Sequence, residues 1–338
     1  MRVVVTGATG NVGTALVERL AADPSIGEIV GVARRAPTTA PARTRWVAAD
    51  VAVDDLAPAM RNADAVVHLA WAIQPSHDST RLWRTNVLGS QRVIDAARTA
   101  GVPAFVHASS IGVYSPGPKD RAVDESWPRE GVATSFYGRH KAEVERRLDV
   151  AEEEGVRIVR MRPGLIFSRR AASGIRRLFL GGVVPRVLLS PRRIPVVPDI
   201  PGLRVQGLHS DDVAAAYHRA LTTPVDGAFN VAAEPVLDAG VLADALDARR
   251  VAVPAAVARA AIDLSWRGRV QPTPPGWLDL GRGVPLMDCT RAATELGWAP
   301  SRTSTDALLE VLEGMADGAG TATPPLRPSR RGARITPG

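Results

Sequence analysis

Short apolar segments alternate with longer segments of helical periodicity through the first 165 residues. Val12, Leu16, Val17 and Leu20, for example, recur at the spacing of one helix face. Such alternation is typical of an α/β fold, in which helices cover both faces of a Rossmann-type, doubly wound parallel sheet. The pattern predicts helices over residues 11–22, 82–100 and 135–154 and strands over residues 3–5, 29–33, 46–48, 65–70, 104–108 and 156–161.

Beyond residue 165 the pattern is less regular. Residues 181–203 are rich in Pro, Gly and Arg, which predicts a loop. Residues 316–338 have few apolar side chains, which predicts a disordered tail. Between them the pattern predicts a strand over residues 228–231 and helices over residues 211–221, 290–296 and 306–315, with Asp288 as the N-cap of the second helix and Gly297 at its end.

The composition narrows the classes of function. The chain has 338 residues, of which 45% are hydrophobic, enough for a large domain with a smaller one. Four of the positive charges behind the net charge of +7 lie in the last 12 residues, and no basic patch with interleaved aromatic residues is present, so we expect no nucleic acid partner. We also expect no membrane span and no signal peptide. The single cysteine, Cys289, excludes an intramolecular disulfide and fits a cytoplasmic protein.

A glycine-rich segment directly follows the first predicted strand and opens the first helix. In Thr6–Gly13 (TGATGNVG), Gly7 allows the tight turn, Gly10 lets the backbone approach a pyrophosphate, and Gly13 lets the helix pack close to the strand. The helix N-terminus then offers N–H groups to the phosphates. The segment predicts a dinucleotide site, and an ordinary structural turn is the alternative.

The end of the second predicted strand favours NADP over NAD. Dinucleotide-binding domains that take NAD usually have an acid there, which binds the ribose 2′-OH, whereas this chain has Arg34 and Arg35. A guanidinium group suits a 2′-phosphate, although two solvated surface arginines are the alternative. After the third strand, Asp50, with Val51 beside it, can bind the adenine amino group or simply belong to the loop.

Tyr137 and Lys141 are the strongest candidates for catalysis. Their spacing of four places both side chains on one face of the predicted helix over 135–154. The chain has only three tyrosines and two lysines, so a chance pairing at this spacing is rare. A phenol with a pKa of about 10 needs a nearby ammonium group to act as an acid or base at neutral pH.

Polar and aromatic residues follow two other predicted strands. Ser109 or Ser110 can hold a substrate oxygen beside the tyrosine, or serve as a turn residue. Asn86, a poor helix former, can bridge a backbone carbonyl or a water near the site, or be a plain polar helix residue. The histidines lack metal-ligand spacing, so no metal is expected. Trp83, Trp266, Trp277 and Trp298 are interpreted as packing residues, and Leu69, Ala70 and Trp71 as neighbours of the cofactor.

Together these segments resemble the extended short-chain dehydrogenase/reductases, also called the NAD-dependent epimerase/dehydratase family. The resemblance covers about residues 1–300. The segments that carry it are Thr6–Gly13, His68–Ala70, Asn86–Gly89, Ser109–Tyr114 (SSIGVY), Tyr137–Lys141 (YGRHK), Arg162–Gly164 (RPG), His209–Val213 (HSDDV), Phe229–Val231 (FNV) and Leu296–Pro300 (LGWAP).

The resemblance implies a dinucleotide-binding Rossmann domain over 1–165, to which 205–232 returns, and a smaller substrate-binding domain of residues 166–204 and 233–315. It implies that Tyr137 is the acid/base, that Lys141 activates it, and that Ser110 rather than Ser109 is the catalytic serine. It also implies a homodimer through the helices near 80–100 and 135–154. The full set of residues expected at the cofactor is Gly7, Thr9, Gly10, Asn11, Val12, Gly13, Arg34, Arg35, Asp50, Val51, Leu69, Ala70, Trp71, Asn86, Ala108, Ser109, Tyr137, Lys141, Pro163 and Leu165.

Two departures from the family pattern narrow the function. Ile111 and Gly112 replace the Asp-Glu pair of sugar-nucleotide dehydratases, which argues against water elimination. Val205 stands where many nucleotide-sugar enzymes have a diphosphate-binding Arg, with Arg204 one position away. We therefore expect an NADP-dependent oxidoreductase that acts on a small carbonyl or alcohol substrate. An NAD-dependent nucleotide-sugar epimerase and a non-catalytic NADP-sensing regulator are the alternatives.

Overall fold

The computed structural model describes residues 1–181 and 184–329, and its centre is a seven-stranded sheet. Every neighbouring pair of strands in this sheet is parallel. The predicted Rossmann-type α/β fold is confirmed, and all six strands predicted within the first 165 residues are present. The strands lie in the order β3 (Thr44–Ala48), β2 (Glu28–Ala33), β1 (Arg2–Thr6), β4 (Ala65–His68), β5 (Ala104–Ala108), β7 (Arg157–Pro163) and β11 (Gly227–Val231).

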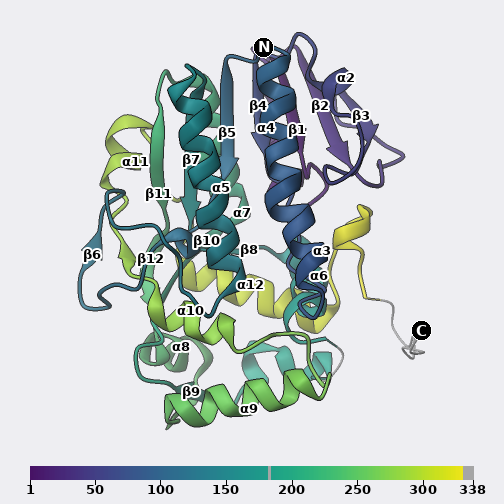
Figure 1. Cartoon of the computed structure of the whole chain (residues 1–338). Coiled ribbons are helices and arrows are strands. Elements are labelled where there is room, and N and C mark those ends of the chain that lie inside the picture. The colour runs from purple at the N-terminus through teal and green to yellow at the C-terminus, as the bar shows by residue number, and fades with distance from the viewer. Residues whose placement is uncertain (182–183, 330–338) are drawn as a thin grey trace.

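Helices cover both faces of this sheet (Figure 1). Alternate residues of β1 separate two cores, because successive side chains of a strand point to opposite faces. Val3 and Val5 pack with residues of one set of helices and Val4 with residues of the other, and all three are fully buried. The first set is α1 (Asn11–Ala22), α7 (Ser210–Thr222) and α11 (Thr290–Glu295), and the second is α2 (Ala57–Met60), α4 (Gly89–Thr99) and α5 (Phe136–Glu153).

The remaining elements lie mainly at the carboxyl ends of the large sheet, in the lower half of Figure 1. They include α6 (Ala172–Phe179), α8 (Ala239–Leu246), α9 (Ala255–Arg267), α10 (Gly276–Gly283) and α12 (Ser304–Asp317). Three small sheets accompany them: β8 (Leu165–Phe167) with β10 (Val205–His209) and β12 (Ala233–Leu237), β9 (Val196–Asp199) with β13 (Arg249–Ala252), and β6 (Ala122–Val123) with β14 (Leu286–Met287).

Several elements differ from the sequence-based expectation. The helix predicted over 82–100 starts as α3 (Ser79–Trp83) and passes through a π-helical turn (Arg84–Leu88) into α4. The loop predicted over 181–203 contains β9, which forms because it pairs with the distant β13. Asp288 lies one residue before the N-cap, yet its carboxylate still accepts the Thr290 N–H at 2.8 Å.

The prediction of a disordered tail over residues 316–338 is wrong for residues 316–329. α12 runs to Asp317, and the following segment folds back against α6. There the Ser173 N–H donates to the Ala319 oxygen at 3.1 Å, and Leu326 is only 4% exposed. This single buried apolar side chain and the hydrogen bonds around it are enough to fix the segment. Residues 330–338 lie outside the described residues.

The predicted domain boundaries stay a prediction. Within the segment 205–232, β11 is a strand of the large sheet and α7 packs on that sheet, as expected. β10 instead pairs with β8 and β12 in a small sheet. In the described part of the chain, no helix combines the length and the apolar character that a membrane span requires.

Candidate active site

The glycine-rich segment between β1 and α1 turns tightly beside the end of β4. Gly7 has a φ of +69°, and a Cβ there would lie 2.6 Å from the Ala70 nitrogen. A Cβ at Gly13 would lie 2.3 Å from the Gly7 oxygen, so α1 packs closely against the turn. Among the described residues, no side chain caps α1 at its N-cap Gly10. The N–H groups of the first helical turn are therefore left for an anion.

Asn11 connects this turn to the segment after β8. Its side-chain amide donates to the Ile166 oxygen at 3.4 Å, and its Oδ1 accepts from the Ser168 hydroxyl at 2.7 Å. Thr9 is buried and Val12 is half-buried in the same turn. The side chain of Asn11 thus connects two protein segments.

The predicted recognition residues for the adenosine half lie at the ends of β2 and β3. Arg34 and Arg35 follow β2 directly and are exposed, and neither makes an ion pair within residues 1–181 and 184–329. The Asp50 carboxylate accepts the Ala52 N–H at 3.0 Å, as a loop residue does, and Val51 is buried. Asp50 also borders a cavity of about 320 Å³, lined by Asp50, Ala52, Val53, Asp78, Thr80, Arg81, Arg84 and Thr85.

Lys141 is buried in the second turn of α5 and is only 3% exposed. Its Nζ donates to the Ala108 oxygen at the end of β5, at 2.5 Å, and lies 3.4 Å from the centre of the Trp71 ring. Burial lowers the pKa of Lys141 to about 7, and the nearby Glu145 carboxylate opposes this shift. Burial thus disfavours the charged form of Lys141 in this environment.

Tyr137, Ser110 and Gly112 meet at the start of α5. Burial raises the pKa of the half-buried Tyr137, and a hydrogen bond with the Ser110 hydroxyl acts in the opposite direction. A Cβ at Gly112 would lie 3.0 Å from Cε1 of the Tyr137 ring, so the glycine lets the phenol lie close to the serine. Ser110 Oγ also accepts the Gly112 N–H at 3.0 Å. The structure therefore brings together the three residues that the sequence predicted as catalytic.

Ser109 faces a different environment from the one expected. Its hydroxyl donates to the fully buried carboxylate of Glu145. The same carboxylate accepts from Nε and Nη2 of Arg162 at 2.9 and 2.6 Å. Only the backbone of Ser109 is left for a cofactor. The ion pair was not predicted, because Arg162 comes from β7 and no local spacing connects it to Glu145 of α5.

The remaining predicted cofactor residues lie where parallel strands end. Asn86 is fully buried in the π-helical turn, and its amide bonds both the N–H and the oxygen of Ala72, at 2.7 and 2.8 Å. This bridge to the backbone, one of the two alternatives for Asn86, fixes the chain just after Trp71. Leu69 and Ala70 are half-buried, Pro163 ends β7 and is buried, and Leu165 is 42% exposed.

Trp277 packs against a hydrophobic cluster, as interpreted from the sequence, and it also contacts Tyr137. Its ring centre lies 4.9 Å from that of Tyr137, with 38° between the ring planes. Phe179, the last residue of α6, lies 5.1 Å from Trp277 in an edge-to-face arrangement. Trp298, by contrast, is 4% exposed and donates to the Asp212 oxygen, as a packing residue would. No sequence signal placed α6 and α10 next to the tyrosine, because both segments are short and distant along the chain.

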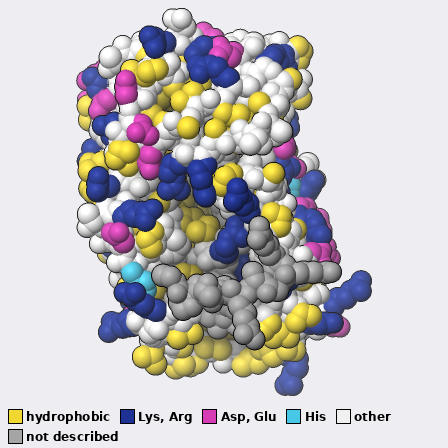
Figure 2. Space-filling model, turned by 90° about the vertical axis from the view of Figure 1, so that its right-hand side faces the viewer, with side chains coloured by type: hydrophobic (Ala, Val, Ile, Leu, Met, Phe, Trp, Pro, Cys, Tyr) yellow, Lys and Arg dark blue, Asp and Glu magenta, His cyan; other side chains and the backbone are white. Residues whose placement is uncertain are grey.

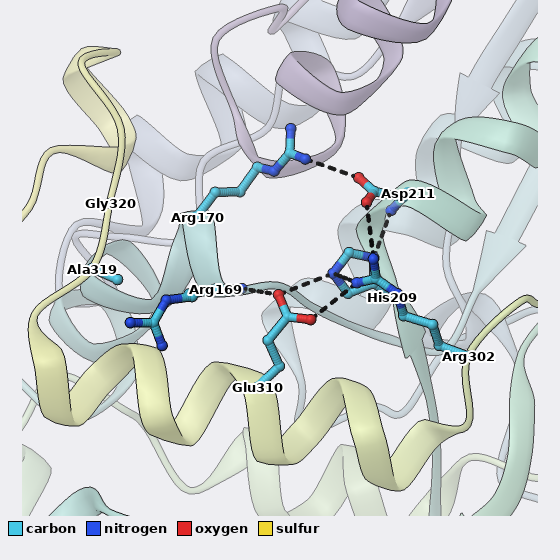
Figure 3. Close-up of a pocket in the computed structure, with 8 residues that line it drawn as sticks. All are labelled: Arg169, Arg170, His209, Asp211, Arg302, Glu310, Ala319 and Gly320. Carbon is cyan, nitrogen blue, oxygen red and sulfur yellow. Dashed lines mark hydrogen bonds and ion pairs between the residues drawn. The ribbon is translucent and has the colours of Figure 1, made fainter.

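A second cavity, of about 390 Å³, lies at the start of α7 (Figure 3). Its charged side chains come from the segment after β8, from the start of α7 and from α12. They are paired with one another: Arg170 with Asp211 at 3.1 Å, and Arg302 with Glu310 at 3.0 Å. The lining residues are Arg169, Arg170, His209, Asp211, Arg302, Glu310, Ala319 and Gly320. The third arginine of the lining, Arg169, pairs with Asp317 outside the cavity, so each of the three arginines has an acidic partner and the ion pairs connect the segment after β8, α7 and α12.

The face on the right of Figure 1 is hollowed near its middle, where Lys and Arg side chains border the hollow (Figure 2). Among the described residues, no group of three or more His, Cys, Asp or Glu residues could hold a metal ion.

A model of the NAD dependent epimerase/dehydratase family matches residues 3–232, which include the glycine-rich turn, the Tyr–Lys pair and β11. The chain belongs to this family. The resemblance inferred from its motifs is confirmed.

Three curated relatives illustrate the range of this family. The chain is 28% identical over 305 residues to the uncharacterized protein Rv2047c of Mycobacterium tuberculosis, covering 89% of this chain but only 28% of that protein. It is 32% identical over 161 residues to the UDP-glucose 4-epimerase of Mycolicibacterium smegmatis, covering 43% of this chain and 50% of the relative. It is 30% identical over 207 residues to the 3-beta-hydroxysteroid dehydrogenase of Mycolicibacterium neoaurum, covering 57% and 56%.

Solved structures of the family share the fold. The UDP-glucuronic acid 4-epimerase from Bacillus cereus, in complex with UDP-glucuronic acid and NAD, superimposes with a TM-score of 0.68. The alignment covers 94% of this chain and 99% of that chain at 19% identity, so the likeness is one of fold. The turn that a Cβ at Gly7 or Gly13 would fill, and the uncapped start of α1, fit the dinucleotide that the family binds.

Proposed function

We propose that this family member is an NADP-dependent oxidoreductase that transfers hydride between the nicotinamide and a small carbonyl or alcohol substrate, with Tyr137 as the acid/base. The observation that carries the proposal is the meeting of the Tyr137 phenol, the Ser110 hydroxyl and the buried Lys141 ammonium at the carboxyl ends of β4 and β5. Ligands of open α/β sheets bind at this edge.

Each residue has a distinct role in the proposed reduction. Tyr137 donates a proton to the substrate oxygen, and Ser110 holds that oxygen with its hydroxyl. Lys141 lies 5.7 Å from the centre of the Tyr137 ring, where its positive charge favours the phenolate that the proton transfer leaves behind. The nicotinamide supplies the hydride when the cofactor is bound, with its pyrophosphate at Gly10 and the start of α1.

The charged form of Lys141 matters for this mechanism. Burial lowers the pKa of Lys141 to about 7, so the charged form needs support from its surroundings. The ribose hydroxyls of a bound cofactor would accept from the ammonium form, and the anionic phosphates would favour it. Cofactor binding thereby raises the fraction of charged Lys141 and prepares the tyrosine for proton transfer.

The preference for NADP rests on the end of β2. Arg34 and Arg35 are exposed there and no acid is present, so both guanidinium groups are available to a 2′-phosphate. The basic border of the hollow in Figure 2 suits an anionic ligand in general. A homodimer through α4 and α5, which pack on the same face of the large sheet, is part of the same proposal.

An experiment with the two arginines and the bound cofactor tests the proposal. We expect purified protein to lose its cofactor on dialysis and to regain activity when NADPH is added. R34A/R35A should raise the KM for NADPH by about tenfold, the value of a charge-assisted phosphate contact, without changing the KM for NADH. The exposed pair Arg192 and Arg193, replaced by Ala, is the matched control. Equal use of NADH and NADPH by both variants and wild type would contradict the NADP preference.

Epimerisation is the second candidate, since the relative from Mycolicibacterium smegmatis is a UDP-glucose 4-epimerase. An epimerase of this type keeps its cofactor, so NAD that survives dialysis together with turnover of a UDP-sugar would favour it. The Tyr–Lys pair argues against the third candidate, a non-catalytic NADP-sensing regulator.

A further inference from the structure

Aromatic side chains surround the Tyr137 phenol. The chain has only seven Trp, three Tyr and five Phe residues, and five of them meet here. Trp277 lies 4.9 Å from Tyr137 and Trp71 lies 6.0 Å from it, the latter edge-on at 74°. Phe136 and Phe179 each contact Trp277 edge-on, at 6.2 and 5.1 Å. We call these residues the aromatic wall: Trp71, Phe136, Tyr137, Phe179 and Trp277.

The aromatic wall differs from the aromatic residues of the core. Tyr114, Tyr217, Phe105 and Phe229 are at most 2% exposed, whereas all five members of the aromatic wall are only half-buried. Their rings meet edge-on or tilted and do not stack face to face. Five large aromatic side chains therefore keep part of their surface exposed around the Tyr137 phenol.

Two polar atoms in the aromatic wall lack partners. The indole N–H groups of Trp71 and Trp277 are shielded from solvent and have no hydrogen-bond acceptor among the described atoms. Buried donors are nearly always satisfied, because leaving one unpaired is unfavourable. A hydrogen-bond acceptor from a ligand would satisfy them once the surrounding side chains shift to admit it.

Arg204, one position from the place where many nucleotide-sugar enzymes have a diphosphate-binding Arg, and its neighbour Lys119 are engaged in contacts within the protein. Arg204 donates to the Lys119 oxygen and lies 3.6 Å from the Asp238 carboxylate. Lys119 in turn donates to the oxygens of Arg204 and Gly281, at 2.7 and 2.8 Å. Both cations thus connect the loop before β10 to α10, the helix that carries Trp277, and are not free for phosphate groups.

We propose that the site takes an apolar, ring-bearing ketone or the corresponding secondary alcohol, which stacks on Trp277 beside Tyr137, and not a sugar nucleotide. The inference rests on the proposed function. In the reduction, hydride from NADPH forms the new C–H bond at the carbonyl carbon, the carbonyl π-bond breaks, and the oxygen takes the Tyr137 proton, which solvent replaces. The products are the alcohol and NADP⁺.

The test measures turnover by the full chain with three probes: NADPH oxidation with 2-tetralone and with glyceraldehyde, and NADP⁺ reduction with UDP-glucose, whose hydroxyl groups can only donate hydride. We expect kcat/KM for 2-tetralone to exceed that for glyceraldehyde by about tenfold or more, the value of one well-buried apolar group. W277A should raise the KM for 2-tetralone by a similar factor, and W277F should recover most of the loss. Trp266, which stacks on His77 instead, supplies the control W266A, which should behave as wild type.

Binding measurements separate a failure of the inference from a failure of the proposed function. Calorimetric titration of 2-tetralone into Y137F with NADP⁺ reports on the aromatic wall without turnover. Binding that W277A abolishes, in a protein whose wild type never oxidises NADPH, would support the inference and overturn the proposed function. Turnover of glyceraldehyde or UDP-glucose without binding of 2-tetralone would overturn the inference and leave hydride transfer standing. Absence of both binding and turnover of 2-tetralone, or kinetics unchanged in W277A, would also overturn the inference.

Discussion

The carboxylate of Glu145 holds several motifs of the site in one network. It accepts from Ser109 and from two nitrogens of Arg162, and Arg162 Nη1 donates to the Tyr114 hydroxyl at 3.0 Å. That hydroxyl donates to Asn230 Oδ1 at 2.6 Å. The SSIGVY, RPG and FNV segments, which the sequence could only mark as family motifs, are thus joined through one buried ion pair. Arg162 lowers the pKa of Glu145 despite its burial.

We expect Glu145→Ala to lower the free energy of unfolding by about 3–5 kcal/mol, because it leaves the Arg162 guanidinium buried without its partner. Denaturation in urea, followed by circular dichroism, measures the change. Glu130→Ala removes an exposed partner of Arg146 and should cost less than about 1 kcal/mol. Similar losses in the two variants would mean that the buried network does not stabilise the fold.

At this scale, the helical spacing of Tyr137 and Lys141 predicted that pair, and the family resemblance selected Ser110 over Ser109. The sequence did not predict that the Ser109 hydroxyl binds Glu145 and not the cofactor. That contact depends on Glu145, which comes from the separate segment α5. The sequence also left Trp277 as a packing residue, because contact with Tyr137 depends on how α10 folds back over the sheet.

At the scale of elements, the start of α1 is fixed by the close approach of backbone atoms at Gly7 and Gly13. Gly7 and Gly13 allow contacts that any Cβ would block, and the predicted helix over 11–22 matches α1. Long, periodic segments such as this are predictable from local pattern alone. β9, β13, β6 and β14 are not, since each has at most four residues and forms only by pairing with a distant strand.

Gly13→Ala should raise the dissociation constant of NADPH by about tenfold or more, because the added methyl group pushes α1 away from the turn that receives the pyrophosphate. Titration of the protein with NADPH, followed by its fluorescence, measures the constant. Gly27→Ala is the control, since a Cβ there meets only the Met1 oxygen at 3.7 Å. An unchanged constant for Gly13→Ala would remove the turn from the cofactor site.

At the scale of the whole molecule, the elements at the carboxyl ends of the sheet complete the site. α6 and α10 bring Phe179 and Trp277 to the phenol, while β5 and α5 supply Ser110, Tyr137 and Lys141. The described tail residues fold back on α6, so the chain up to residue 329 belongs to this arrangement. Family membership explains the Rossmann-type sheet and its helices. The aromatic wall is defined only by the residues of this chain.

The central claim is that Tyr137 supplies the proton in an NADP-dependent hydride transfer. The most direct measurement compares kcat for NADPH oxidation in wild type and Y137F, with the carbonyl compound that wild type reduces fastest and with NADPH binding checked in both. The account predicts a loss of kcat of about a hundredfold or more in Y137F with NADPH binding retained. Equal kcat in the two proteins would contradict it.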